Sequence, residues 1–385
     1  MNSYFKATVF TLLVLTITLN NDLCFSQNSD DNISIGKFES VYSEILEEER
    51  SLMVHLPQGY DHTSTRYPVL YILDGDFIPT FAKATGTVDV LSYNGQIPPM
   101  IIVSIRNTDR GRDMFPIKID RISNSGGADK FLGFINEELI PFVNRNYRTV
   151  DNKVLFGESN SALFTIYALL TKPDTFDAYV ASSPTIGWCS DLISDKARTT
   201  FEERKSLNKF LYIIYGENDF PQVITTVPGF TKILKDNSPK DFRWETVKLD
   251  NEGHVPYISL KNGIEAYYSE IVPTPDMMMQ GLEGVISFYK DVSKKFDFEI
   301  CPPEMVLFNL AGPFLAQKQF SEAKEILEYL VIAHPASADG YFFLGEVYRD
   351  QKENSKALRC YRKAIEIDPN YLKAKTLLTQ MMKNK

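Results

Sequence analysis

The chain has 385 residues, of which 44% are hydrophobic and 24% are charged, and this composition is ordinary for a folded protein with a hydrophobic core. Because single cores rarely grow beyond about 250–300 residues, two domains are expected. The net charge of −9 argues against nucleic acid as a partner, since its phosphates would be repelled.

The first residues have the pattern of a secretory signal peptide over residues 1–26. Lys6 provides the positively charged start, residues 7–19 are mostly apolar, and the segment ends in the small residue Ser26. The apolar run is shorter than the roughly 20 residues that a membrane helix needs. The three residues before Cys24 lack the small side chains of a lipid-anchored cysteine site. We therefore expect export to a periplasm or beyond, with no transmembrane span in the mature chain.

Three cysteines follow the predicted signal peptide, namely Cys189, Cys301 and Cys360. Their scattered positions fit neither a disulfide framework nor metal-ligand spacing, so a packing role is expected. Asp74 and Asp76 could suggest a metal pair, but no clustered histidines or further carboxylates accompany them. The sequence therefore predicts no metal and no cofactor.

From about residue 33 to residue 275, strand patterns alternate with helical patterns. Several strand candidates are short and continuously apolar, as expected for parallel strands that are covered on both faces. They are residues 52–56, 69–73, 100–105, 153–156, 178–181 and 210–215. A helical pattern with an apolar stripe covers residues 128–146. This alternation predicts the α/β class, with a doubly wound and mostly parallel sheet.

The remainder of the chain, after the proline-marked residues 273–276, has almost entirely helical patterns. Within it, matched positions recur 34 residues apart, for example Leu310 with Leu344 and Pro335 with Pro369. The period and the residue types are those of the tetratricopeptide (TPR) helical repeat, and the second copy matches more closely than the degenerate first copy. The expected division is a signal peptide at 1–26, an α/β domain at 27–275, a helical connector at 276–303, two TPR repeats at 304–337 and 338–371, and a capping helix at 372–385.

Ser159 lies where an apolar strand pattern runs directly into a helical pattern, in the sequence Gly157-Glu158-Ser159-Asn160-Ser161. This is the form of a nucleophile elbow, G-x-S-x-G, in which a tight strand-to-helix turn exposes a serine hydroxyl. The principal chemical use of a serine placed in this way is attack on an acyl carbon. Ser161 stands where the pattern has its last glycine, and serine is the nearest small substitute at a point where strand and helix pass close together.

A serine hydroxyl needs a base to remove its proton, and the chain has four histidines as candidates. His55 lies inside a strand pattern, His62 in a polar turn, and His334 in a repeat helix. His254 lies in a loop marked by glycine and proline, directly after the strand-like residues 244–249. His254 is therefore the predicted base.

The acid that orients the histidine should lie between Ser159 and His254, because this fold keeps the chain order serine, acid, histidine. The apolar strand that ends at Tyr215 runs into a segment that holds Glu217 and Asp219. Asp219 is the first choice and Glu217 the alternative, and capping of the following helix is a competing role for either carboxylate.

The developing oxyanion needs two aligned N–H donors. One predicted donor is the backbone N–H of Asn160, directly after the nucleophile. The other is expected in the loop after the strand at residues 69–73, where the backbone N–H of Asp76 is the first choice.

Together these motifs resemble the putative-esterase branch of the α/β-hydrolases, which includes esterase D-like enzymes, siderophore esterases and relatives that deacylate carbohydrates. The resemblance covers about residues 38–272 and is carried by residues 67–76, residues 110–116, the elbow at Ser159, Ser183-Pro184 and residues 253–256. The TPR extension resembles that of a secreted bacterial subgroup with the same architecture. The resemblance implies Ser159 as nucleophile, His254 as base, Asp219 as acid, and the amides of Asp76 and Asn160 as oxyanion donors.

Four neighbouring residues carry further expectations. Glu158 stands where this family often has a neutral or histidine side chain, and its charge is expected to slow attack or to tune the site for a positively charged or polar substrate. Arg112 and Asp113 are expected to pair and to brace their loop near the active-site rim. Trp188 is a candidate wall of the substrate pocket, although buried packing is the commoner role of tryptophan.

Two functions from different classes follow from these patterns. The first is an exported serine ester hydrolase that acts through an acyl-enzyme, with an acylated polysaccharide or oligosaccharide as the first choice of substrate and a siderophore ester as the alternative. The second is a TPR-based binding or scaffold protein with an inactive hydrolase domain. In both cases the repeats are a candidate surface for a protein partner or for self-association.

Overall fold

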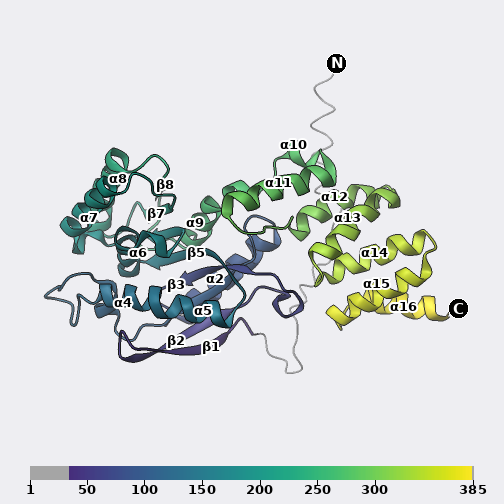
Figure 1. Ribbon diagram of the computed structural model, residues 1–385, viewed down its shortest axis with the longest axis horizontal. Helices are drawn as coiled ribbons and strands as arrows, with labels where there is room; N and C mark the ends of the chain where they lie inside the picture. The colour runs from purple at the N-terminus through teal and green to yellow at the C-terminus, as the bar shows by residue number, and fades with distance from the viewer. Residues whose placement is uncertain (1–33, 384–385) are drawn as a thin grey trace, which may run out of the picture.

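The computed structural model describes residues 34–383, so the predicted signal peptide at residues 1–26 lies outside the described residues. An eight-stranded sheet is followed by a series of helices (Figure 1). The strands are β1 (Lys37–Ser43), β2 (Glu48–His55), β3 (Tyr67–Ile72), β4 (Ile101–Ile105), β5 (Thr149–Glu158), β6 (Ala178–Ser182), β7 (Phe210–Gly216) and β8 (Arg243–Leu249).

The helices fall into two groups along the chain. Those between or beside the strands are α2 (Ile78–Tyr93), α3 (Arg110–Met114), α4 (Ala128–Phe134), α5 (Ile140–Asn146), α6 (Asn160–Thr171), α7 (Ser190–Glu203), α8 (Pro221–Asn237) and α9 (Ser259–Tyr267). The later helices are α10 (Pro275–Met278), α11 (Gly281–Phe296), α12 (Glu304–Ala316), α13 (Phe320–Ala333), α14 (Ala338–Asp350), α15 (Asn354–Ile367) and α16 (Leu372–Lys383). Short 3₁₀ turns are η1 (Tyr60–His62), η3 (Pro173–Thr175), η4 (Ile186–Trp188) and η5 (Ser269–Ile271).

The sheet has the strand order β1-β2-β4-β3-β5-β6-β7-β8. Strand β2 is antiparallel to β1 and to β4, and all later pairings in this order are parallel. The predicted α/β class with a mostly parallel sheet is therefore confirmed. Because the carboxyl ends of parallel strands meet at one edge, the loops that follow β3, β5, β7 and β8 are brought together there.

The helix predicted over residues 128–146 forms as one continuous helical run with an internal irregularity. A π-helical segment, η2 (Ile135–Leu139), joins α4 to α5. Pro141 lies just after this segment, and proline has no N–H to donate to the preceding turn. A π-bulge is one way in which a helix accommodates such a break without ending.

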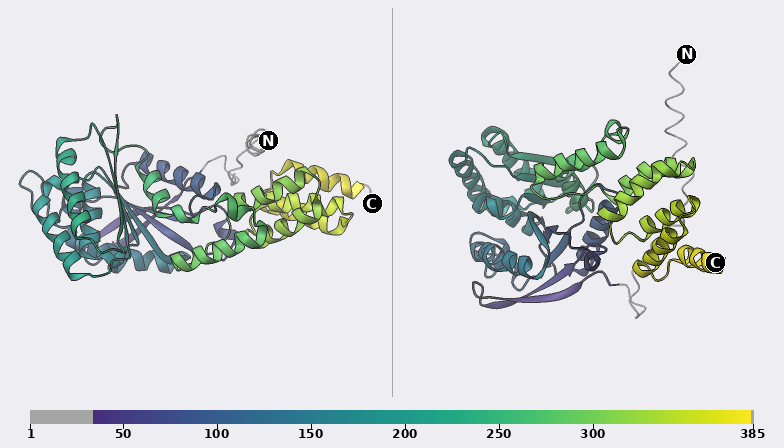
Figure 2. Two further views of the ribbon diagram at one scale, coloured as in Figure 1. Left: turned by 90° about the horizontal axis from the view of Figure 1, so that it is seen from above. Right: turned by 45° about the vertical axis from the view of Figure 1, so that its right-hand side comes forward.

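Each face of the sheet is covered by its own hydrophobic core. One core joins the sheet to α4, α5, α6, α7 and α8, with fully buried Phe131 and Phe164 among its largest side chains. The other core joins the opposite face to α2 and α9 through residues such as Phe81 and Ile264. This second core continues without a break into the C-terminal helices, which extend from one side of the sheet (Figure 2).

An aromatic contact ties the C-terminal helices to the central strand. Phe296, at the end of α11, packs against Tyr267 and Tyr268 with ring centroids 5.6 and 5.4 Å away. The hydroxyls of both tyrosines bond to the buried side-chain amide of Asn152 in β5, at 2.8 and 2.7 Å. The helix that precedes the repeats is therefore anchored to the sheet through side chains that are buried or half-buried.

The repeat region consists of two helical hairpins whose helices begin 34 residues apart, at Glu304 and Ala338 and again at Phe320 and Asn354. Small residues lie fully buried between the paired helices, as Ala311, Ala323 and Ala357 do. Among the described helices, from α2 to α16, none is both long and apolar enough to cross a bilayer.

Ending the chain after Pro275 removes the helices that complete the second core, so we expect the shortened protein to aggregate. Because one core crosses the junction, the intact protein should show a single cooperative thermal transition. A matched control ends the chain after Tyr371, since α16 buries Ala374 alone among its described residues. This control should stay soluble. A soluble, folded protein that ends at Pro275 would contradict the shared-core interpretation, as would two separate transitions in the intact chain.

Candidate active site

The turn between β5 and α6 holds Ser159 in an unusual backbone conformation, with φ 61° and ψ −115°. The turn is tight because the strand and the helix nearly touch. A Cβ atom on Gly157 would lie 2.4 Å from the carbonyl oxygen of Ser161, so only glycine fits at position 157. The N–H of Ser159 donates to the carbonyl of Ser182 in the neighbouring strand at 2.8 Å. This is the geometry of a nucleophile elbow.

A second close approach brings the loop after β8 back over the end of β7. A Cβ atom on Gly216 would lie 2.2 Å from the carbonyl oxygen of Gly253, so glycine is again required. The N–H of Asn218 donates to the carbonyl of Glu252 at 2.8 Å, which fixes the two loops together. His254 follows directly and is thereby carried over the carboxyl edge of the sheet.

The structure brings Ser159, His254 and Asp219 into one hydrogen-bonded row. The Nε2 atom of His254 lies 2.9 Å from the Ser159 hydroxyl, and its Nδ1 atom lies 2.6 Å from Oδ1 of Asp219. The side chain of Asp219 is fully buried, whereas Ser159 and His254 are half-buried. Donation from Nδ1 to the carboxylate leaves Nε2 as an acceptor for the serine proton.

The Asp219 carboxylate is held by two further donors. The hydroxyl of Ser183 donates to Oδ2 at 2.5 Å, and the backbone N–H of Phe220 donates to Oδ1 at 2.7 Å. Burial raises the pKa of Asp219, but the hydrogen bonds from His254, Ser183 and Phe220 outweigh burial and place this pKa below its usual value. The carboxylate is therefore ionised throughout the neutral range.

Glu217, the alternative acid, lies apart from this row. Its carboxylate accepts from the backbone N–H of Asn251 at 3.3 Å and lies 3.5 Å from the ammonium of Lys248. These contacts brace the base of the loop that carries His254. Of the two carboxylates, it is Asp219 that contacts the imidazole.

The two predicted oxyanion amides lie at matching positions on adjacent strands. Ile72 of β3 pairs with Phe156 of β5, so Asp76 and Asn160 each come four residues beyond that pair. Neither backbone N–H forms a hydrogen bond with another atom of residues 34–383. Asn160 is also the first residue of α6, where the helix dipole favours negative charge. Both amides are available to a ligand at the edge that carries Ser159.

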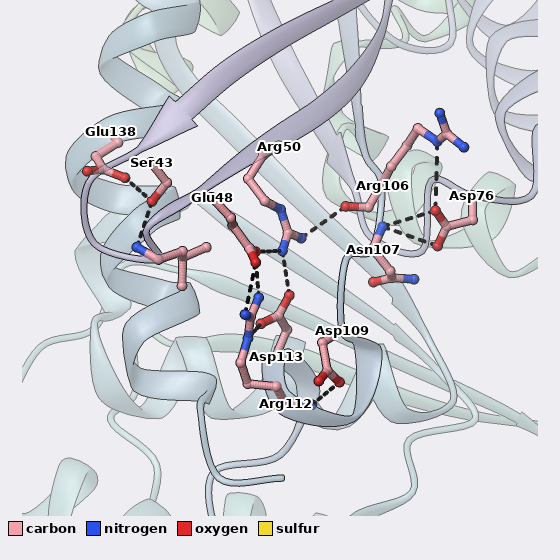
Figure 3. A network of polar contacts seen from close by, with 11 residues as sticks. Ser43, Glu48, Arg50, Asp76, Arg106, Asn107, Asp109, Arg112, Asp113 and Glu138 are labelled. Atoms are coloured by element: carbon pink, nitrogen blue, oxygen red, sulfur yellow. Dashed lines mark hydrogen bonds and ion pairs between the residues drawn. The ribbon is translucent and has the colours of Figure 1, made fainter. Parts of the chain in front are cut away.

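A buried ionic network braces the loops beside this edge (Figure 3). The predicted contact between Arg112 and Asp113 is present at 2.7 Å, and the fully buried Arg50 donates to Asp113 at 2.7 Å. Glu48 binds both arginines, and hydrogen bonds from Arg112 lower the pKa of Glu48 to about 2. Arg50 also donates to the carbonyl of Arg106 at 2.9 Å, which fixes the end of β4.

The carboxylate of Asp76 is held by the loop after β4 (Figure 3). Its oxygens accept from the backbone N–H of Asn107 at 3.1 and 3.2 Å, and the guanidinium of Arg106 lies 3.7 Å away. The side chain of Asp76 is therefore occupied by this neighbouring loop, while its backbone N–H remains unpaired within the described residues.

The charge of Glu158 is matched by Lys83 of α2. The ammonium of Lys83 lies 2.8 Å from Oε1 of Glu158, and both side chains are largely shielded, at 12% and 18% exposure. The same ammonium lies 5.5 Å from the ring centre of Tyr257, in the loop after His254. The carboxylate beside Ser159 is thus compensated by a cation that the sequence pattern did not reveal.

Two aromatic side chains differ in their surroundings, because one is packed against the core and the other lies against His254. Trp188 is partly buried and packs edge-on against Phe115, with ring centroids 6.1 Å apart, which agrees with the packing role. The ring of Phe220 lies 4.1 Å from the imidazole of His254 and is 51% exposed. Phe220 was missed by sequence reasoning, although its position directly after Asp219 could have indicated it.

The described residues, 34–383, contain no group of three or more histidine, cysteine, aspartate or glutamate side chains that could hold a metal ion. Cys189 and Cys360 are buried, and Cys301 is partly exposed. Asp74 is engaged by Arg110, which donates from Nε and Nη2 at 2.7 and 2.8 Å.

Comparison with known proteins agrees with this geometry. Residues 43–212 match the family described as "Putative esterase", and residues 338–371 match the tetratricopeptide repeat. The chain is 30% identical over 216 residues to the ferri-bacillibactin esterase BesA of Bacillus subtilis. This match covers 49% of this chain and 74% of that protein. It is 32% identical over 151 residues to a siderophore triacetylfusarinine C esterase of Aspergillus fumigatus, over 36% of this chain and 51% of that protein.

A solved structure of a serine hydrolase is also similar to this chain. The IroE-like serine hydrolase of Shewanella oneidensis, 27% identical, superposes with a TM-score of 0.64 over 77% of this chain and 98% of that chain. The chain belongs to the putative esterase family of the α/β-hydrolases. It is an ester hydrolase that carries a C-terminal TPR repeat.

The contact between Asp219 and His254 yields a first test. Asp219→Asn should lower kcat by about 10³- to 10⁴-fold, because an amide can favour the wrong imidazole tautomer and no longer stabilises imidazolium. Glu217→Gln is the matched control and should keep kcat within about twofold of the wild type. Steady-state kinetics with a p-nitrophenyl ester measures both variants. If kcat falls strongly in Glu217→Gln while Asp219→Asn stays active, Glu217 and not Asp219 is the acid that orients His254.

The ion pair between Lys83 and Glu158 yields a second test. Lys83→Met leaves a carboxylate uncompensated beside the nucleophile, which disfavours the developing oxyanion, and should lower kcat about fivefold, or about 1 kcal/mol. The double variant Lys83→Met/Glu158→Gln should recover most of that loss, since both charges are then absent. If the double variant is no better than Lys83→Met, charge compensation is not the role of Lys83.

Proposed function

We propose that Ser159, His254 and Asp219 hydrolyse an ester through a covalent acyl-enzyme. The observation that supports this proposal is the continuous row from carboxylate to imidazole to hydroxyl, at 2.6 and 2.9 Å, beside two amides that have no partner among residues 34–383. Both distances lie within the range at which an imidazole can act as general base towards a serine.

In the proposed reaction, Nε2 of His254 takes the proton of Ser159 while the serine oxygen forms a bond to the ester carbonyl carbon. The negative charge that develops on the carbonyl oxygen is bound by the N–H groups of Asp76 and Asn160. His254 then returns the proton to the departing alcohol, and the acyl group remains on Ser159. A water molecule, deprotonated by the same imidazole, releases the acid and restores the serine.

For the substrate, we propose an ester of the siderophore type, with an acylated polysaccharide or oligosaccharide as the alternative. Support comes from the two relatives, both described as esterases of siderophores. The exposed ring of Phe220 against His254 and the 74% exposed Tyr257 provide aromatic surface beside the site. Such surface suits the planar groups or apolar faces of either ligand class.

We also propose that the chain is exported through residues 1–26 and is divided at residue 275 into a catalytic and a helical part. The helical part is proposed to consist of a connector at 276–303, repeats at 304–337 and 338–371, and a cap at 372–385. The TPR match at residues 338–371 supports a protein partner or self-association at this part, alongside the hydrolase activity.

A substrate panel tests the proposed function with one pair of proteins. The mature chain and its Ser159→Ala variant receive a ferric siderophore ester, acetylated glycans and a feruloyl ester, and released acids are measured. We expect the highest kcat/KM with the siderophore ester, and a loss of about 10⁴-fold or more in Ser159→Ala, because the nucleophile is removed.

Labelling by a fluorophosphonate distinguishes the remaining outcomes. The wild type should be labelled at Ser159 and the variant should not. Preference for acetylated glycans would support the alternative substrate. A wild type that neither hydrolyses any ester nor becomes labelled would contradict the catalytic assignment.

A further inference from the structure

Ser161 departs from the glycine of the elbow pattern, and its side chain is fully buried. Its hydroxyl oxygen accepts from the backbone N–H of Glu158 at 2.8 Å and lies 2.8 Å from Oδ2 of Asp74. The carbonyl oxygen of Glu158 is equally close, at 2.8 Å. A hydroxyl has one proton, and an ionised carboxylate is the stronger acceptor, so the bond to Asp74 is favoured.

Asp74 lies in the loop that carries one of the proposed oxyanion amides. Its backbone has a positive φ of 58°, and the next residue, Gly75, donates from its N–H to the carbonyl of Ile105 at 2.7 Å. The loop therefore turns sharply at Asp74 before it presents the N–H of Asp76. A non-glycine residue in this conformation depends on its side-chain contacts to hold it there.

The carboxylate of Asp74 receives donors from three directions. Arg110 binds it with two N–H groups at 2.7 and 2.8 Å, Asn107 donates from Nδ2 at 2.8 Å, and Ser161 donates from the helix side. Arg110 and Asn107 belong to the loop and helix after β4, whose start is fixed by buried Arg50. Among these donors, Ser161 alone belongs to the element that follows the nucleophile.

The bond between Ser161 and Asp74 thus joins the two halves of the proposed oxyanion hole. Asp74 is two residues before Asp76, and Ser161 is one residue after Asn160. We propose that Ser161 is a positioning residue that sets the spacing of the Asp76 and Asn160 amides through Asp74. The inference rests on the proposed function. It gives Ser161 a role that glycine could not fill, because glycine has no hydroxyl to donate to Asp74.

The test replaces Ser161 by Gly, which restores the common pattern, and by Ala. Each variant is assayed with p-nitrophenyl butyrate, and rates are divided by the number of sites that a fluorophosphonate titrates. We expect kcat/KM to fall roughly 10- to 100-fold, because misplaced oxyanion donors lose transition-state binding. The Ki of butaneboronic acid, a tetrahedral mimic, should rise by a similar factor, while the Ki of the product butyrate should stay within twofold.

Thr165→Ala is the matched control. Thr165 lies on the same helix, is fully buried, and bonds through its hydroxyl to the carbonyl of Ser161 at 2.9 Å without reaching Asp74. It should keep the wild-type kcat/KM per titrated site. The combination Ser161→Gly/Asp74→Asn should be no slower than the slower single variant, since both remove the same tie.

Several results would overturn the inference. One is a kcat/KM of Ser161→Gly that lies within twofold of the wild-type value. Another is a Ser161→Gly variant that binds butyrate and butaneboronic acid more weakly by the same factor, because equal weakening indicates general distortion of the site. If Ser161→Gly is insoluble, Arg110→Lys tests the same carboxylate from the opposite side and must give the same selective loss of boronic acid binding. A wild type that is neither active nor labelled contradicts the proposed function instead, and removes this inference with it.

Discussion

Two close backbone approaches determine where the candidate active site forms. At the first, the chain leaves β5 so abruptly that the carbonyl oxygen of Ser161 occupies the space where a side chain on Gly157 would be. At the second, the segment before His254 passes over Gly216 with a similar lack of room. Backbone contacts of this kind leave little freedom for adjustment, because neither partner can change rotamer. The 2.9 Å contact between His254 and Ser159 therefore depends on the route of the main chain more than on side-chain packing.

Charge around Ser159 is balanced locally, because each nearby carboxylate has partners of its own. Glu158 is paired with Lys83, and Asp74 with Arg110, so neither contributes an isolated negative charge near Ser159. Asp219 differs, because its partners are the hydroxyl of Ser183, the N–H of Phe220 and the imidazole of His254 and not a lysine or an arginine. The expectation that Glu158 would slow attack considered its charge alone. The structure adds Lys83, 2.8 Å from Glu158, as the partner of that charge.

Sequence reasoning succeeded where the signal is local. Apolar strands, the strand-to-helix transition at Ser159 and the 34-residue period each depend on residues that are close in the chain, and the order of serine, acid and histidine then left few candidates. It failed where a contact depends on how distant elements pack. Lys83 reaches Glu158 across 75 positions and Arg50 reaches Asp113 across 63, and neither pair follows from any spacing. The residues that form the continuous core between the sheet and the C-terminal helices likewise do not follow from any spacing, since apolar residues do not reveal their neighbours.

That shared core gives the helical extension a structural connection to the site. Helix α2 begins just after the loop with Asp76 and carries Lys83, and helix α9 begins just after the loop with His254. Both helices pack their inner faces into the core that continues through Tyr289 to the repeats. The extension therefore supports the two helices that follow the loop with Asp76 and the loop with His254. Helices α2 and α9 and the repeats therefore belong to a single hydrophobic core.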